Sequence, residues 1–186
     1  MFESLGERLE GRVVVLEPLG PQHEDGLRAA AADERIWRWM LTLDVEAWIA
    51  DALRDSDDRQ PFAVLRDGEV VGSTSYMSLA PEHRRLEIGN TWMHPSMWST
   101  GANVEAKYLL LRHAFERLGA LRVEFKTDGL NERARGALAA LPAEFEGVHR
   151  RHMLVRGAER RDSAWYAVID EDWPAVRRTL ETRLSG

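Results

Sequence analysis

Hydrophobic and polar residues alternate over much of the first half of the chain in the manner of β-strands, with helical segments between them. Val13–Leu16 is rich in β-branched residues and predicts a first strand, and residues 23–32 follow it as a helix. Asp44 has a side chain suited to capping a second helix. The dipeptide Asp67-Gly68 predicts a tight hairpin between two strands. The three strands expected in this region cover Pro61–Arg66, Val70–Leu79 and Arg85–Met93.

The middle of the chain contains its clearest helical pattern. Apolar side chains recur there at steps of three and four residues, which places them along one stripe of a helix. The stripe consists of Val104, Tyr108, Leu111, Phe115 and Leu118. We expect Asn103 to cap the N-terminus of this helix and Gly119 to end it.

The last third of the chain alternates between strand and helix patterns. After a strand at Arg122–Thr127, a helix begins behind Asn131 and stops at Pro142. Two more strands and a final helix follow, at Phe145–Val155, Ala164–Ile169 and residues 174–184. The strand–helix–strand crossover requires a parallel pair of strands, so the fold class is mixed α/β. No repeat or linker divides the chain, which predicts a single domain over residues 1–186.

Composition narrows the class of protein. The 186 residues are 44% hydrophobic and 30% charged, which is typical of a soluble globular domain. No cysteine is present, so disulfides, thiolate metal sites and a cysteine nucleophile are excluded. The charged N-terminus lacks a signal core and no apolar run reaches the ~20 residues of a membrane helix, so we expect a cytoplasmic protein without a membrane partner. The net charge of -6 argues against nucleic acid as the main partner.

The segment Pro95–Asn103 joins a strand to the long helix and carries the first candidate chemistry. Its small residues let the main chain approach a ligand closely. The free N–H groups and the positive dipole end of the helix then favour a phosphate group. The spacing matches neither a P-loop nor a GxGxxG fingerprint. On this segment alone, an ordinary helix start behind a tight turn is a commoner explanation than an anion site.

A longer run of residues around this loop resembles the central signature of the GNAT N-acetyltransferases, especially the branch that includes the ribosomal-protein N-terminal alanine acetyltransferases. The run comprises Glu87–Trp92, His94-Pro95, Thr100–Lys107 and Leu110–Glu116. The resemblance continues through Arg122–Asp128, Asn131, Phe145–Gly147, Arg161-Asp162 and Trp165-Tyr166. It covers nearly the whole chain and is most specific between Glu87 and Gly147.

The resemblance implies the GNAT fold, a central mixed sheet that is splayed open between two strands and flanked by helices. Acetyl-CoA would lie between the diverging strands, and no metal is implied. Its pantetheine arm would bond to the main chain of Trp92, Met93 and His94 as an added strand does. Asn131 would reach its amide groups. The diphosphate would be held by the loop residues Trp98, Ser99, Thr100, Gly101, Ala102 and Asn103.

Several departures from the family pattern concern side chains near the cofactor. Trp98 stands where the family often has Arg or Gln, which keeps the main-chain cradle and changes the side chain beside the phosphate. Ala134 stands where this branch has a serine acid, and Leu138 falls where other branches have a tyrosine acid. The CoA thiolate is a good leaving group, with a thiol pKa of ~8.5, so deprotonation of the attacking ammonium is the harder step.

Glu87 is the first candidate for the base that removes this proton, acting through a water molecule. The alternative of equal weight is a solvated charge facing Arg85 or Lys126. Asp162 and His152 are secondary candidates, and a structural polar role is the commoner one for such residues.

Two tryptophans between the first two helices, Trp37 and Trp39, could form the floor of an acceptor site, although completing the core is the commoner role.

The resemblance as a whole implies direct transfer of an acetyl group from acetyl-CoA to a primary amine, on a protein N-terminus or a small molecule. A CoA-binding sensor or scaffold without catalysis is the alternative, because both acids are absent. The family suggests a homodimer.

Overall fold

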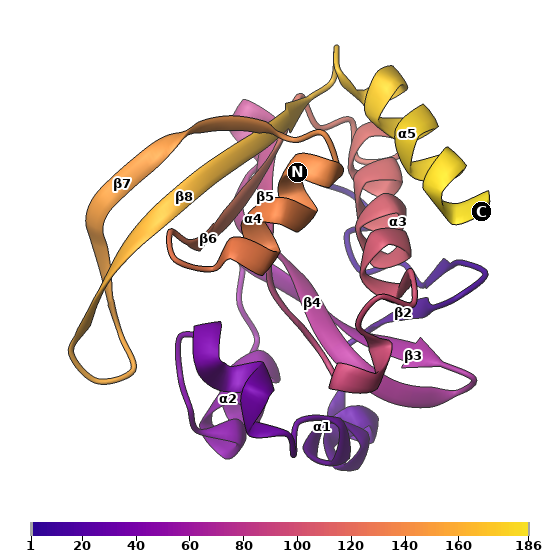
Figure 1. Cartoon of the computed structure of the whole chain (residues 1–186). Coiled ribbons are helices and arrows are strands. Elements are labelled where there is room, and N and C mark those ends of the chain that lie inside the picture. The colour runs from indigo at the N-terminus through magenta and orange to yellow at the C-terminus, as the bar shows by residue number, and fades with distance from the viewer. Residues whose placement is uncertain (1, 186) are drawn as a thin grey trace.

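Eight strands form one sheet within residues 2–185, the part of the chain that the computed structural model describes (Figure 1). They are β1 (Leu9–Glu10), β2 (Val15–Pro18), β3 (Arg59–Arg66), β4 (Glu69–Ala80), β5 (Arg85–Met93), β6 (Arg122–Asp128), β7 (Glu144–Val155) and β8 (Glu159–Ile169). The α-helices are α1 (Glu24–Ala30), α2 (Val45–Ala52), α3 (Ala102–Glu116), α4 (Glu132–Ala140) and α5 (Trp173–Ser185). Short 3₁₀ segments are η1 (Pro21–His23), η2 (Glu34–Trp39), η3 (Pro81–His83) and η4 (Pro95–Met97). None of the helices in residues 2–185 is both long enough and apolar enough to cross a membrane.

The sheet opens between β5 and β6. Its strands lie in the order β1-β2-β3-β4-β5-β6-β8-β7, and all neighbours are antiparallel except β5 and β6. That parallel pair extends only over Arg85–Glu87 and Arg122–Glu124. Beyond Glu87 the rest of β5 pairs with no described strand on this side, so the two strands diverge. The predicted splayed mixed sheet is confirmed.

Helices cover both faces of the sheet, with a separate core on each face (Figure 1). α3, α4 and α5 contribute to one core together with Leu86 and Ile88 of β5, whereas α1 and α2 pack around Trp92 of the same strand. The change of face occurs near Asn90, whose φ of +50° accompanies an irregularity in the pairing with β4. This bulge lies in the part of β5 that has left β6.

Local sequence signals account for the hairpin and for one helix start. Asp67 and Gly68 adopt φ angles of +52° and +83°, the left-handed pair that a two-residue type I′ turn requires. The Asp44 carboxylate accepts the Ala47 N–H at 3.0 Å, so the predicted cap of α2 is confirmed.

Several element boundaries were predicted wrongly. Gly101, not Asn103, is the N-cap of α3; it is left-handed at φ +86°, and the helix begins at Ala102. The helix ends at Glu116, ahead of Gly119. β8 begins at Glu159, five residues before the predicted start, and β1 is too short to produce an alternating pattern.

The apolar stripe predicted for α3 is not its main buried face. Of the five stripe residues only Leu111 is fully buried, and Tyr108 and Phe115 pack against Trp173 of α5 instead. The side chains that fill the core below the helix include Ala106, Leu109, Leu110 and Ala114. α3 therefore lies between the sheet and α5 and buries two faces, of which the periodicity indicates one.

A buried carboxylate ties the start of α3 to the N-terminal strands. Glu105 is 4% exposed and accepts the N–H groups of Arg12, Val13 and Val14 at 2.9, 2.6 and 2.7 Å. A Cβ at Gly11 would lie 2.3 Å from this carboxylate, so the position requires glycine. The clamp fixes the first turn of α3, directly after the loop that carries the candidate phosphate site.

Candidate active site

The candidate active site lies in the gap where β5 and β6 diverge. The His94 N–H donates to Val71 O of β4 at 2.8 Å, so this N–H is directed to β4 and not to the gap. Successive residues direct their main-chain groups to opposite edges of a strand, and Met93 therefore presents its N–H and C=O to the gap. Of the three residues predicted to contact the pantetheine arm, Trp92, Met93 and His94, Met93 has the main chain that faces the gap.

The loop between η4 and α3 presents unused main-chain donors. Ser99 and Gly101 have φ angles of +63° and +86°, and neither N–H has a hydrogen-bond partner among residues 2–185. No atom lies within 4 Å of the position that a Cβ would take at Gly101, so the space beside this residue is open. The Thr100 hydroxyl donates to Met97 O at 2.7 Å and stabilises the turn. Free donors at the N-terminus of α3 fit a diphosphate.

The remaining residues predicted to hold the cofactor have contacts within the protein. Ala102 is fully buried, and Asn103 accepts a hydrogen bond from the Lys107 ammonium at 2.8 Å. Asn131 caps α4 through its Oδ1, which accepts the Ala134 N–H at 3.1 Å. The side-chain nitrogen of Asn131 is left available to donate to a ligand.

The Trp98 indole lies across the free edge of β5. Its Nε1 donates to Met93 O at 3.2 Å, which is the carbonyl that a pantetheine amide would use. The guanidinium groups of Arg133 and Arg35 lie 3.8 and 5.6 Å from the ring centroid. The indole thus connects β5 with the first turn of α4 and with η2. A ligand that adds to β5 as a strand has to displace it from Met93.

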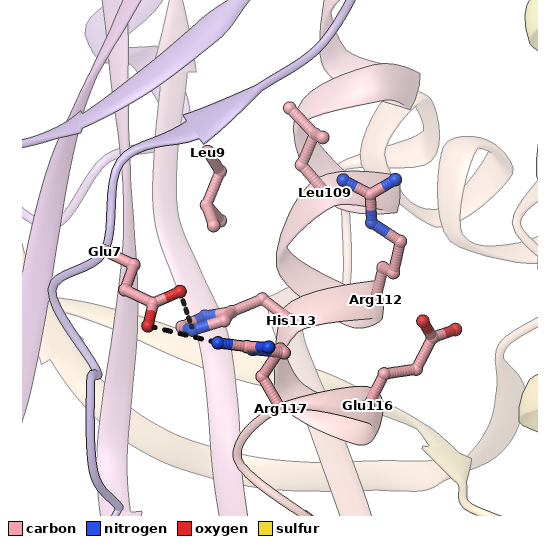
Figure 2. A pocket seen from close by; sticks show the side chains of 7 residues that line it. All are labelled: Glu7, Leu9, Leu109, Arg112, His113, Glu116 and Arg117. Carbon is pink, nitrogen blue, oxygen red and sulfur yellow. Dashed lines mark ion pairs between the residues drawn. The ribbon is translucent and has the colours of Figure 1, made fainter.

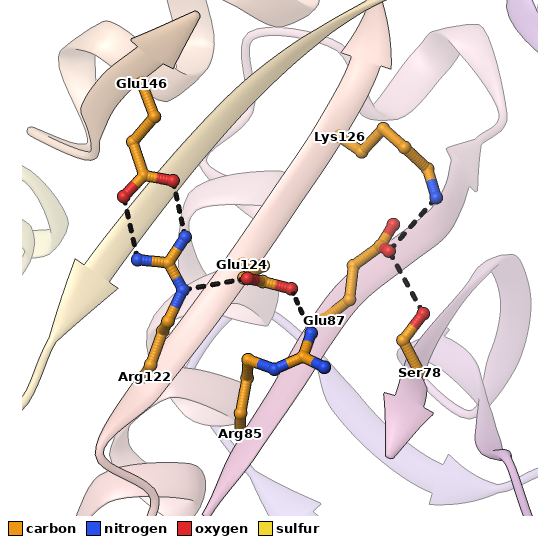
Figure 3. A network of polar contacts seen from close by, with 7 residues as sticks. All are labelled: Ser78, Arg85, Glu87, Arg122, Glu124, Lys126 and Glu146. Atoms are coloured by element: carbon orange, nitrogen blue, oxygen red, sulfur yellow. Dashed lines mark hydrogen bonds and ion pairs between the residues drawn. The ribbon is translucent and has the colours of Figure 1, made fainter. Parts of the chain in front are cut away.

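Glu87 ends the short β5–β6 pairing and is buried, with 2% of its surface exposed (Figure 3). Its carboxylate accepts hydrogen bonds from Lys126 Nζ at 3.2 Å and from Ser78 Oγ at 3.4 Å. Burial raises the pKa of Glu87 above its ordinary value, although the ammonium of Lys126 opposes the shift. A carboxylate with a raised pKa at the start of the gap is suited to accept a proton from an ammonium group.

The alternative interpretation of Glu87 as a solvated charge is wrong, because the side chain is buried. Of its two expected partners it pairs with Lys126, whereas Arg85 bonds to Glu124 at 2.7 Å. The Arg85–Glu124 pair continues into a chain of alternating charges along this face of the sheet (Figure 3). A cavity of about 300 Å³ opens beside this row of charged side chains and is lined by Arg85, Arg122, Glu124, Glu146, His149 and Trp165.

The two secondary candidates for a base hold the β7–β8 hairpin together. The Asp162 carboxylate accepts the Arg151 N–H at 2.6 Å. Nδ1 of His152 lies 3.0 Å from the Ser163 hydroxyl, and burial is the main cause that lowers the pKa of this imidazole. Both side chains have structural partners, as expected for polar residues in a sheet.

The two tryptophans predicted to wall the acceptor site differ in burial. Trp37 is 4% exposed, donates from Nε1 to Ala31 O at 2.9 Å and packs 5.7 Å from Trp92, centroid to centroid. It therefore completes the core. Trp39 is half-buried, with the guanidinium of Arg38 5.0 Å from its ring. Of the pair, only Trp39 has an indole that is open to solvent.

A second cavity, of about 220 Å³, lies far from the gap, between the N-terminal segment and the C-terminal half of α3 (Figure 2). His113 lines this cavity and is buried, with 3% of its surface exposed. Its Nδ1 lies 3.2 Å from the Tyr76 hydroxyl and its Nε2 lies 3.8 Å from the Glu7 carboxylate. Burial lowers the pKa of His113.

A family model described as an acetyltransferase (GNAT) domain matches residues 14–143. Since the match covers more than half of the chain, the protein belongs to the GNAT acetyltransferase family.

Solved structures with the same fold extend this result. The chain is similar to a GCN5-related N-acetyltransferase from Brucella melitensis, with 33% identity, 95% of this chain and 85% of the other covered, and a TM-score of 0.87. It shares its fold with the Mycobacterium smegmatis RimJ in complex with CoA-disulfide, with 24% identity, 96% of this chain and 95% of the other covered, and a TM-score of 0.82. The uncharacterized N-acetyltransferase YoaA of Bacillus subtilis (strain 168) is 29% identical over 101 residues, 54% of this chain and 56% of that protein. That match therefore spans about half of each protein.

Two features near the gap were missed by the sequence prediction. Asn90 accepts the Trp48 Nε1–H at 3.2 Å from within the bulge of β5. Asparagine tolerates a positive φ better than most residues do, which is the one local signal for this bulge. The contact between Trp98 and Met93 depends on the path of the loop, which no periodicity indicates.

Proposed function

We propose that the protein transfers an acetyl group from acetyl-CoA to a primary amine by direct attack in a ternary complex. The observation that carries this proposal is the combination of two unpaired main-chain donors, at Ser99 and Gly101, with an edge of β5 at Met93 that pairs with no strand and is covered by the Trp98 indole. The donors suit a diphosphate, and the strand edge suits the two amides of a pantetheine arm. Acetyl-CoA, when bound, would supply the acetyl group as a thioester.

The residues of the chain have distinct tasks in this reaction. The loop and the β5 edge orient the donor, and a fixed geometry removes much of the entropic barrier to the attack. Glu87 accepts the ammonium proton through a water molecule, which frees the nitrogen lone pair to attack the carbonyl carbon. As the new C–N bond forms, the C–S bond breaks. The acetylated nitrogen then gives up its second proton to water. The thiolate leaves without a strong acid and takes up a proton from water, which agrees with Ala134 and Leu138 at the family's acid positions.

Replacement of the loop glycine tests the proposed cofactor site. Gly101→Glu places a carboxylate in the open space and adds strain at a φ of +86°, so acetyl-CoA binding should be lost. Isothermal titration calorimetry with acetyl-CoA measures this. Gly157→Glu is the matched control, because Gly157 has a φ of +97° and open space around it at the tip of the β7–β8 hairpin. Equal affinities for the two variants would place the diphosphate elsewhere.

A non-catalytic CoA-binding sensor is the second candidate function, favoured by the absence of an acid at Ala134 and Leu138. Release of free thiol from acetyl-CoA, measured against a panel of amines and N-terminal peptides, separates the two functions. Acceptor-dependent release with mass detection of the acetylated product eliminates the sensor. Tight acetyl-CoA binding without release against any acceptor eliminates the transferase.

A further inference from the structure

Buried polar atoms without partners gather on the face of the sheet that α1 and α2 cover. Within residues 2–185, five of the six such side-chain atoms belong to this face. They are Arg59 Nε, Ser75 Oγ, Trp92 Nε1, Arg161 Nε and Trp165 Nε1. Strand pairing relates them, because residues paired across strands, and residues two apart along a strand, share a face. Buried polar groups are nearly always paired in native proteins, so these atoms are sites for hydrogen bonds to water or to a polar ligand.

Two members of this set are charged: Arg59 forms an ion pair with Asp51 through another guanidinium nitrogen, whereas Arg161 forms none with the described residues. Arg161 is 6% exposed, its Nε has no partner, and no carboxylate among residues 2–185 lies within ion-pair distance of its guanidinium. Arginine stays protonated in proteins, so the side chain is a buried positive charge. A buried ion without a counter-ion is strongly unfavourable, and it is normally retained where an anion binds.

The carboxylates near Arg161 are already paired with other cations. Asp128 and Glu87 act electrostatically on the guanidinium. Asp128 lies 3.8 Å from Arg156, and its Oδ1 accepts the Leu130 N–H at 2.9 Å. Glu87 is bonded to Lys126. Arg156 also bonds to Glu159 at 2.6 Å, so this cation is shared between two carboxylates. Arg161 has no carboxylate of its own within ion-pair distance, and it lies within electrostatic reach of the candidate base.

The far end of this face is closed by a contact between two segments distant in sequence. Arg156, at the tip of the β7–β8 hairpin, donates from its main-chain N–H to Leu41 O at 3.1 Å and from Nη1 to Met40 O at 2.8 Å. The hairpin is thereby held against the segment that follows η2. The cavity of about 300 Å³ is lined by Trp165, which lies four residues from Arg161 on the same side of β8.

We propose that Arg161 binds a carboxylate carried by the amine acceptor, so that the acceptor is a free amino acid or a peptide with an acidic residue next to its terminal amine. This inference rests on the proposed acetyl transfer. The acceptor nitrogen lies toward Glu87, and its acidic group pairs with the guanidinium in the two-pronged geometry that arginine and carboxylate share. Binding of the substrate supplies the counter-ion that the protein lacks.

Acceptor pairs that differ only in the carboxylate test this proposal. One arm compares amino acids with their carboxamides, and the other compares Ala-Asp with Ala-Asn peptides, both as C-terminal amides. We expect kcat/KM to favour the acidic member of one arm by about tenfold or more. The arm that responds identifies the source of the carboxylate. Equal rates for both members in both arms, with acetyl transfer intact, would overturn the inference and leave the proposed function standing.

Variants of Arg161 provide the second measurement. Arg161→Met should raise KM for the acidic acceptor to that of its neutral partner, and Arg161→Lys should restore part of the preference. Arg160→Met is the control, since Arg160 is exposed and is directed to the opposite side of β8. Arg161→Met should also raise Tm, because it removes an unpaired buried charge. A fall in Tm, or an equal loss for acidic and neutral acceptors, would show that Arg161 is structural.

A binding measurement separates this inference from the proposed function. Calorimetry in the presence of CoA compares N-acetylalanine with its amide, and N-acetyl-Ala-Asp with N-acetyl-Ala-Asn, for the natural protein and Arg161→Met. Binding of an acidic member that the variant loses, without acetyl transfer to any acceptor, would refute the transferase and retain the anion site. Transfer to amines without any Arg161-dependent binding of an acidic member would refute the anion site and retain the transferase.

Discussion

At the scale of single residues, the proposed acetyl transfer and acceptor binding depend on charged side chains whose burial is energetically unfavourable. Glu87 is buried beside the gap with only Lys126 and Ser78 as partners, and burial dominates the direction of its pKa shift. The sequence identified Glu87 through its place in the resemblance, but not its burial. Arg161 shows the limit of sequence reasoning more clearly, because its lack of a counter-ion depends on which residues the fold places around it.

Substitution of the candidate base should separate catalysis from cofactor binding. Glu87→Gln should lower kcat by about 100-fold or more, as loss of a general base does, and leave acetyl-CoA affinity unchanged. Steady-state kinetics and calorimetry measure the two quantities. Glu171→Gln, at an exposed position between β8 and α5, is the control and should retain full activity. Full activity in Glu87→Gln would assign the proton transfer to another group.

The raised pKa of Glu87 also determines a pH dependence. The base works as the carboxylate, so kcat/KM should fall as the pH is lowered through a pKa above the ordinary glutamate value, and Glu87→Gln should lack this limb. Because the folded state holds the proton more tightly than the unfolded chain, the shift favours folding below the ordinary pKa. That contribution is lost as the pH rises through the folded pKa. A pH–rate profile with the same acid limb in both proteins would contradict the assignment.

At the scale of elements, alternation and turn chemistry predicted most strands, whereas features that depend on distant contacts were missed. β3 and β4 follow from their apolar runs and from the left-handed turn at Asp67-Gly68. The early start of β8 was missed because its first residues, Glu159–Asp162, are all charged and show no apolar alternation. The main buried face of α3 was missed because a helix between a sheet and α5 has two apolar faces, and one period describes only one of them.

The carboxylate clamp at the start of α3 predicts a large stability effect for one substitution. Glu105→Gln removes the charge that accepts three main-chain N–H groups and should lower the free energy of unfolding by about 3 kcal/mol. Urea denaturation measures this. Glu132→Gln, in the exposed first turn of α4, is the control and should change the value by about 0.5 kcal/mol or less. Similar losses in both variants would mean that the clamp is not fixing the β1–β2 connection.

At the scale of the whole molecule, the gap between β5 and β6 joins two surfaces with different tasks. One face carries α3, whose N-terminus offers free main-chain donors, and the other face, on the side of α1 and α2, carries the unpartnered polar side chains. Sequence could indicate the loop and the family, because both depend on contiguous residues. It could not indicate that Trp98 covers Met93 or that the β7–β8 hairpin closes the opposite face, because these contacts depend on how separate elements meet.

The most direct test of the account is a crystal structure of the protein with acetyl-CoA. We expect the diphosphate to accept hydrogen bonds from the N–H groups of Ser99 and Gly101, and the pantetheine arm to lie along β5. The Trp98 indole should then have left Met93 O, to which it donates at 3.2 Å in its present position. A gap that stays empty at saturating acetyl-CoA with Trp98 still bonded to Met93, or a diphosphate bound at any other helix, would contradict the account.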